Sequence, residues 1–173
     1  MSAILGTLMG GIIADRYGAR RIASLFAILT GSISLDGKFA GVGHKNGLLL
    51  LNNTGGLTWA TKKIRRVREI SISTRTGRMS IASGQKVVYL IDRKGAVIWH
   101  RVLQSSAVST SISSNGNIIV VGTNLGRLVV LNGKGKMLWE THLSNSDFPV
   151  NSVDISSDGK FLVAGTKYSH LYL

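Results

Sequence analysis

The chain is poor in several residue types. Its 173 residues contain no cysteine and one proline. Without cysteine, neither a disulfide framework nor a Cys-based metal site can form. Acidic residues are also few, with 8 Asp and Glu against 21 Lys and Arg and a net charge of +13. This charge favours nucleic acid, anionic lipid or an acidic protein as partner, but it specifies no fold.

What the chain does contain is a repeat. Trp59, Trp99 and Trp139 are 40 residues apart, and each closes the same phrase, Leu/Ile-Asn/Asp-x-x-Gly-x-x-x-Trp. A second phrase, centred on Ser-Ile-Ser and followed by a glycine turn, precedes each copy and starts a fourth time at 154–159. A fixed period near 40 residues indicates a repeat architecture.

The third repeat unit shows what one copy forms. Its pattern predicts four strands, over residues 108–113, 118–123, 127–131 and 137–141. The second of these is β-branched and apolar throughout, so we expect both of its faces to be buried. Asn115-Gly116 predicts a type I′ turn, because both residues tolerate positive φ. Four antiparallel strands in one repeat correspond to a β-propeller blade.

The sequence therefore predicts an all-β fold. This fold is a partial β-propeller of about three and a half four-stranded blades, preceded by a short helical N-terminal segment. We expect the helical segment at 1–31 and the blades at 32–68, 69–108, 109–150 and, incomplete, 151–173. Propellers close with four or more blades. The open flank predicts a fragment of a larger propeller, or an assembly that a second copy or another chain completes.

Two sets of repeated residues have predicted structural roles. A small residue late in the second strand of each blade would face a neighbouring blade, where a Cβ would clash. These residues are Gly43, Gly84, Gly122 and Gly165. The indoles of Trp59, Trp99 and Trp139 would lie between adjacent blades, each with its N–H bonded to the backbone.

The phrase that ends in tryptophan resembles the repeat of PQQ-type quinoprotein propellers. The Ser-x-Asp-Gly-Lys phrases at 34–43 and 156–165 resemble those of WD-repeat propellers. Together the resemblances imply a PQQ-like or WD-like propeller over 32–173. They leave the function open, because propellers host enzymes, scaffolds and receptors.

Catalysis is not expected. A quinoprotein dehydrogenase needs a catalytic base, clustered oxygen ligands for Ca²⁺ and an axial cofactor pocket. The acidic residues of 32–173 are not closely spaced, and the vicinal cysteine pair often seen in such enzymes is absent. The histidines share no ligand spacing, and each is expected to be a solvated loop or strand-edge residue. They are His44, His100, His142 and His170. We therefore expect no catalytic, metal-binding or cofactor-binding residues.

Residues 1–31 lie outside the repeat and consist of two apolar stretches around a charged turn. Residues 11–21 resemble the loop between the second and third transmembrane helices of major facilitator superfamily transporters. The matching residues are Gly11, Asp15, Arg16, Gly18, Arg20 and Arg21. In that family the glycine permits close helix approach and the basic residues hold the loop inside.

The rest of a transporter bundle does not follow, and neither apolar stretch reaches the roughly 20 residues of a membrane span. Transport is therefore not expected. Three interpretations of 1–31 stay open: a helical hairpin packed on the propeller, a membrane anchor, or a fusion scar from a neighbouring transporter gene.

One cluster of basic residues stands in the connection from the first predicted blade to the second. It consists of Lys62, Lys63, Arg65, Arg66 and Arg68. The cluster could bind phosphate or an acidic partner, or it could be a solvated loop whose charges block edge pairing. Nucleic acid is disfavoured, because no exposed aromatic residues interleave with the charges.

We accordingly predict a non-enzymatic scaffold that binds a protein partner. The alternatives are a membrane-associated protein with a transporter-derived N-terminus and a basic nucleic-acid-binding surface. The compartment stays open between cytoplasmic and membrane-associated.

Overall fold

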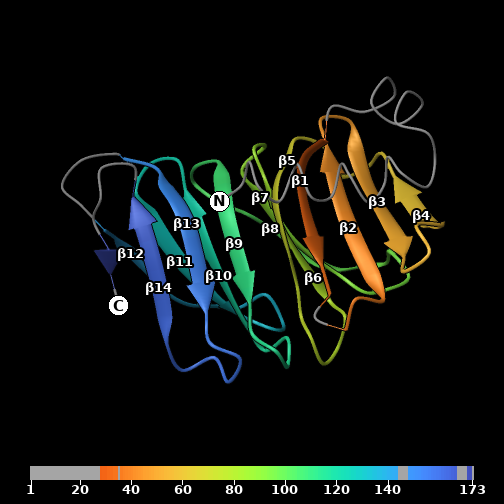
Figure 1. The fold of residues 1–173 in the computed structure, drawn as a ribbon. Coiled ribbons are helices and arrows are strands. Elements are labelled where there is room, and N and C mark those ends of the chain that lie inside the picture. Colours follow the sequence, from red (N-terminus) through yellow and green to blue (C-terminus); the bar gives the residue numbers. More distant parts are fainter. Residues whose placement is uncertain (1–27, 35, 144–147, 167–170, 173) are drawn as a thin grey trace.

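A computed structural model of the chain describes residues 28–34, 36–143, 148–166 and 171–172. These residues form antiparallel sheets (Figure 1). The first sheet consists of β1 (Ile28–Ile33), β2 (Phe39–His44), β3 (Gly47–Asn52) and β4 (Leu57–Thr61). The second consists of β5 (Val67–Ile72), β6 (Met79–Ser83), β7 (Val87–Ile91) and β8 (Val97–Val102). The third consists of β9 (Ala107–Ile112), β10 (Ile118–Thr123), β11 (Arg127–Asn132) and β12 (Met137–His142). The fourth consists of β13 (Val150–Ile155), β14 (Leu162–Thr166) and β15 (Leu171–Tyr172).

Consecutive strands pair within each sheet, and successive sheets contact each other through their first strands, β1, β5, β9 and β13. Figure 1 shows the sheets side by side in chain order. This arrangement confirms the predicted all-β partial propeller with an incomplete fourth blade. The predicted helical segment falls largely on residues 1–27, outside the described residues. Its last residues, 28–31, belong to β1.

Three apolar clusters lie between successive sheets, and the inner sheets contribute to the clusters on both of their faces. Leu48 and Ile81 meet between the first and second sheets. In β10, Ile119 and Val121 pack toward the second sheet, whereas Val120 packs toward the fourth. This division follows from the alternation of side chains along a strand. The predicted burial of both faces of β10 is thus confirmed.

The repeated Asn/Asp-x-x-Gly phrase forms the turn between the third and fourth strands of a blade. The Asp92 carboxylate accepts the backbone N–H groups of Lys94 and Ala96, both at 2.8 Å. Asn52 and Asn132 make the same pair of bonds in their own turns. The glycine that follows has φ near +80° in all three turns, a conformation that strains other residues. The repeat therefore encodes a specific turn rather than a binding motif.

The turn at Asn115-Gly116 differs from the predicted type I′ geometry. Gly116 has φ of 71°, but Asn115 is not in the positive-φ region. The Asn115 side-chain oxygen instead accepts bonds from the Ser113 hydroxyl and the Asn117 N–H, each at 2.9 Å. A side chain that bonds its own turn removes the need for a second positive φ.

Candidate interaction surface

Two of the three tryptophans make the contact predicted for them. Trp59 donates its indole N–H to the Arg93 carbonyl at 2.8 Å, and Trp99 donates to the Gly133 carbonyl at 3.1 Å. Each ring thereby covers the glycine turn of the next sheet. Trp139 is 43% exposed and has no such partner among the described residues. The indoles therefore join blade to blade.

Gly43 and Gly122 occupy the same register position in β2 and β10, facing the first strand of the next sheet. A Cβ on Gly122 would lie against the Ser109 hydroxyl and 2.6 Å from the Val150 carbonyl oxygen. A Cβ on Gly43 would lie against the Val67 side chain. Both positions thus have the predicted close approach to a neighbouring blade.

The other two glycines of this predicted set differ. Gly165 has the register position of Gly122, but nothing in the described structure lies within 4 Å of its Cβ site. Gly84 lies one residue beyond β6, and the register position in that strand belongs to Ala82. The prediction for Gly84 is therefore corrected: matching by residue type placed it two residues away from its structural counterpart.

The first strands of successive sheets are joined by polar side chains that carry no recognisable sequence signal. The Thr110 N–H donates to the Glu69 carboxylate at 2.6 Å, and the Ile112 N–H donates to the Ser71 hydroxyl at 3.2 Å. Both N–H groups lie on the edge of β9 that faces away from β10. Burial raises the pKa of Glu69 to about 7, with the charge of Asp154 acting in the same direction. Glu69 thus gives a hydrogen-bond partner to a backbone N–H on the free edge of β9, between two blades.

The predicted basic cluster lies at one end of the first two sheets and is extended there by two turns. We call this surface the basic rim. It consists of Lys45, Lys62, Lys63, Arg65, Arg66, Arg68 and Lys86, and all seven are exposed. Backbone bonds at 3.0 Å join its parts, because the Arg66 N–H donates to the Lys45 carbonyl and the Gly84 N–H donates to the Arg66 carbonyl.

Two features show that the basic rim is held in place by the fold. Ile64, in the middle of the charged sequence, is 1% exposed and packs in the core between the first two sheets. Arg66 and Lys86 have φ of 50° and 67°, and they are the non-glycine residues with positive φ in the described part of the chain. Such backbone strain persists only where surrounding contacts impose it.

A hollow of about 250 Å³ opens on this surface, lined by Lys45, Arg66, Arg68 and Gly84. We call it the basic hollow. A Cβ on Gly84 would lie 3.2 Å from the Arg68 side-chain Nε, so the glycine leaves room for this guanidinium. Within the described residues, the ion pairs involve other side chains and leave these three cations uncompensated. The arrangement concentrates positive charge around space that an anionic group can enter.

The acidic side chains among the described residues lie outside the basic rim. Asp36, Asp92 and Asp158 are in turns at the opposite end of the sheets, and each accepts backbone N–H bonds there. Glu140 forms an ion pair with Arg127 at 3.0 Å. The end of the sheets opposite the basic rim therefore carries both acidic and basic side chains, whereas the basic rim carries basic side chains only.

The described histidines differ in their environments. His44 is buried, in contrast to the solvated position expected for it, and burial lowers its pKa. His100 and His142 are exposed, and His170 lies outside the described residues. Across the described ranges, no group of three or more His, Cys, Asp or Glu residues could hold a metal ion.

No helix within the described residues has the length and apolar character of a membrane span. The residues of the transporter-like motif all precede residue 28 and lie outside the described part of the chain. They are Gly11, Asp15, Arg16, Gly18, Arg20 and Arg21.

The blades, their turns and the indole contacts together define a β-propeller of PQQ-like repeats. A family model, PQQ_2, described as outer membrane protein assembly factor BamB, matches residues 16–167. The chain belongs to this family. The match begins within residues 1–31, ahead of the predicted blades. The comparisons give no support to the transporter resemblance.

Among solved structures, Kuenenia stuttgartiensis hydrazine synthase is similar, with 18% sequence identity and a TM-score of 0.70. The similarity covers 82% of this chain and 43% of that chain, so this chain spans less than half of its length. At this identity the likeness shows the fold alone. No curated protein matches the chain.

Proposed function

We propose that the chain is a non-enzymatic propeller scaffold that binds a protein partner, and that the basic rim receives an acidic segment of this partner. The basic hollow is the observation that carries the proposal. Lys45, Arg66 and Arg68 surround it without a compensating carboxylate among the described residues. Like charges held together repel each other, and an anionic group bound between them relieves this repulsion.

Two further points support a binding role. The family description names an outer membrane protein assembly factor, and a protein partner is consistent with that description. The strained backbone of Arg66 and Lys86 fixes two cations of the basic rim, and such strain is concentrated at functional positions. A preformed surface loses less conformational entropy when it binds a partner.

A fluorescein-labelled hexaglutamate peptide tests the proposal by fluorescence anisotropy. The double variant Lys45→Glu/Arg68→Glu reverses two charges at the basic hollow. The matched control, Lys94→Glu/Lys136→Glu, makes the same change in exposed turns at the opposite end. We expect the first variant to weaken binding by about 10-fold or more and the control by about 3-fold or less.

Equal weakening by both variants would show a response to net charge alone and would contradict the proposal. A mixed-sequence single-stranded DNA is the second probe. If it binds more tightly than hexaglutamate at the same salt concentration, with a steep loss of affinity as salt rises, the nucleic-acid alternative replaces the acidic partner. Membrane attachment through 1–31 and completion of the ring by further blades stay predictions.

A further inference from the structure

The last strand of the second sheet, β8, has an edge that no other strand of the described chain covers. The Leu103 N–H donates to the Lys86 carbonyl at 2.7 Å, which fixes the pairing of this end of β8. Bonded and non-bonded pairs alternate along an antiparallel ladder. Arg101 therefore bonds to β7, whereas the backbone N–H and C=O groups of His100 and Val102 point away from β7. An added strand can pair with these groups.

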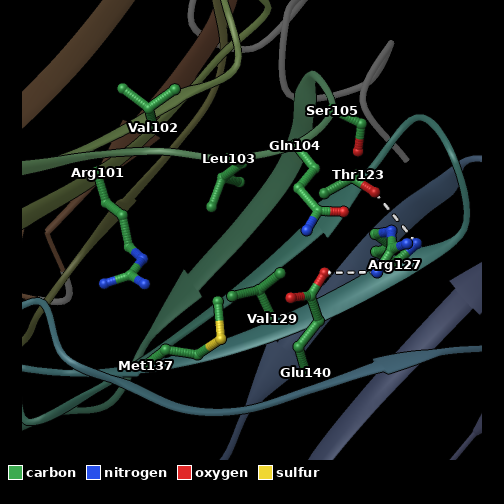
Figure 2. Close-up of a pocket in the computed structure, with 10 residues that line it drawn as sticks. All are labelled: Arg101, Val102, Leu103, Gln104, Ser105, Thr123, Arg127, Val129, Met137 and Glu140. Atoms are coloured by element: carbon green, nitrogen blue, oxygen red, sulfur yellow. Dashed lines mark hydrogen bonds and ion pairs between the residues drawn. The ribbon is translucent and has the colours of Figure 1, made fainter.

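The β8 edge lacks two features that protect edge strands. Proteins protect exposed edges with charged side chains or with proline, which hinder pairing with another chain. β8 contains no proline, and its charged residue is Arg101. The Arg101 guanidinium donates to the Gly135 carbonyl at 3.1 Å, on the side of the third sheet. Figure 2 shows the side chains of Arg101 and Val102 on opposite sides of the strand. The edge is therefore open to backbone pairing.

β8 also exposes large apolar side chains. Val97 is 45% exposed, Ile98 43% and Val102 70%. Side chains on neighbouring strands pack against each other in cross-strand pairs, and β-branched residues are well suited to this packing. A strand added at the free edge would cover these side chains with its own. Burial of apolar surface would then add to the backbone hydrogen bonds.

The same strand leads into the basic rim, because its last bond joins Leu103 to Lys86. A strand rises about 3.3 Å per residue, so a segment paired along β8 reaches the level of Lys86 one or two residues beyond Val102. The other outer strands differ from β8. β4 leads to Lys62 of the basic rim but exposes a single large apolar residue, Leu57, and β12 leads to residues outside the basic rim. β8 thus combines an apolar edge with nearby positive charge.

We propose that the free edge of β8 binds the acidic segment of the partner as an added β-strand. Apolar side chains of the segment lie beside those of β8, and its acidic side chains lie at the end near Lys86. The acidic end rests on the proposed function, but the strand pairing does not. A second copy of this chain is disfavoured as the occupant, because two molecules with a net charge of +13 repel each other. An acidic segment is attracted.

The first test uses the full chain and a fluorescein-labelled peptide of three glutamates followed by Val-Thr-Val-Thr. A second peptide carries the glutamates at the other end and covers the opposite strand direction. The tighter binder is then N-methylated, either at both valines or at both threonines. Alternate residues of a strand point their N–H groups to opposite edges. One analogue should therefore bind about 10-fold or more weakly, and the other should stay within about three-fold of the parent peptide. Equal affinity of the two analogues would overturn the proposal.

The second test examines the backbone of β8. Hydrogen exchange in ¹H–¹⁵N spectra should slow by about 10-fold or more at His100 and Val102 when the peptide saturates the protein, because the added strand bonds these amides. Unchanged exchange at both amides would contradict strand pairing.

A proline variant blocks the edge. His100→Pro removes an outward N–H without removing a bond to β7, and edge strands tolerate proline at such positions. It should weaken peptide binding about 10-fold. Ala60→Pro is the matched control, because Ala60 has the equivalent register position in β4, and it should change the affinity by about two-fold or less. Equal effects of the two substitutions would overturn the assignment to β8. If His100→Pro does not fold, hydrogen exchange in the parent protein decides.

The two proposals fail in different ways. Loss of peptide binding in Lys45→Glu/Arg68→Glu, together with equal affinity of the two N-methylated analogues, supports the proposed function and overturns strand addition. A difference between the analogues that persists in Lys45→Glu/Arg68→Glu, with the affinity of the parent peptide unchanged, supports strand addition and contradicts the role of the basic hollow.

Discussion

Gly122 stands where two neighbouring sheets leave no room for a methyl group. The Val150 carbonyl oxygen, a backbone atom that cannot rotate away, lies 2.6 Å from the site of a Cβ. We expect Gly122→Ala to lower the free energy of unfolding by about 1–3 kcal/mol, because the sheets must separate to admit the methyl group. Urea denaturation measures the change.

Gly165 supplies a matched control for this substitution. It holds the same register position in the fourth sheet, its φ is not in the positive region, and no described atom lies within 4 Å of its Cβ site. Gly165→Ala should therefore change stability by about 0.5 kcal/mol or less. A similar loss in both variants would show that the cost comes from the strand conformation and not from the next sheet.

Glu69 gives the fold a predicted pH dependence. Burial raises its pKa from 4.5 to about 7 in the folded protein. The protonated form is favoured by folding, so its stabilising effect is complete below about pH 4.5 and is lost as the pH rises through about 7. The loss is on the order of 3 kcal/mol.

Glu69→Gln tests this dependence because the amide oxygen can still accept the Thr110 N–H while the charge is removed. Urea denaturation at about pH 5 and pH 8 should show that the parent protein loses stability over this interval and that the variant loses much less. If both proteins lose stability equally, the titration of another group controls this pH range, and the assignment to Glu69 is wrong.

At the scale of elements, the outer strands β4 and β8 are each fastened to the next blade by an indole. Trp99→Phe keeps the ring over the glycine turn but removes the N–H bond to the Gly133 carbonyl. We expect a loss of about 1 kcal/mol in the free energy of unfolding. In Trp139→Phe the loss should be smaller, because Trp139 has no such bond among the described residues. Thermal unfolding of the two variants provides the comparison.

The strands and turns could be predicted from the sequence where residues close together in the chain determine them. The Asn/Asp-x-x-Gly phrase repeats because its side-chain oxygen and its glycine build one turn, as Asp92 and Gly95 show. The strand β10 was predicted with its observed bounds, because its apolar run is buried on both faces. Local patterns of this kind are visible in a single repeat unit.

Features that depend on neighbouring blades could not be predicted in the same way. Gly84 looked like the counterpart of Gly122, but Ala82 holds that position, because pairing register and not residue type decides it. The basic hollow arises where the β2–β3 turn, the β4–β5 connection and the β6–β7 turn meet. Gly84 carries no sequence signal for this, since its role depends on residues distant in the chain.

For the whole molecule, the net charge of +13 implies repulsion that salt should screen. Raising NaCl from about 0.01 M to about 0.15 M shortens the screening length from about 30 Å to about 8 Å. The melting temperature should therefore rise over this range. The basic rim should contribute more to this rise than the opposite end of the sheets, where Lys38 lies 3.5 Å from Asp36 and Lys160 lies 3.8 Å from Asp158.

Two neutralising variants locate the source of this repulsion. Lys62→Gln/Lys63→Gln removes two charges from the basic rim, and Lys94→Gln/Lys134→Gln removes two from exposed turns at the other end. The first variant should flatten the rise in melting temperature with salt more than the second. If both variants reduce the salt-dependent rise in melting temperature equally, the repulsion is spread evenly over the surface. A larger effect at the basic rim would mean that the fold itself concentrates positive charge there, at a cost in stability that an acidic partner would relieve.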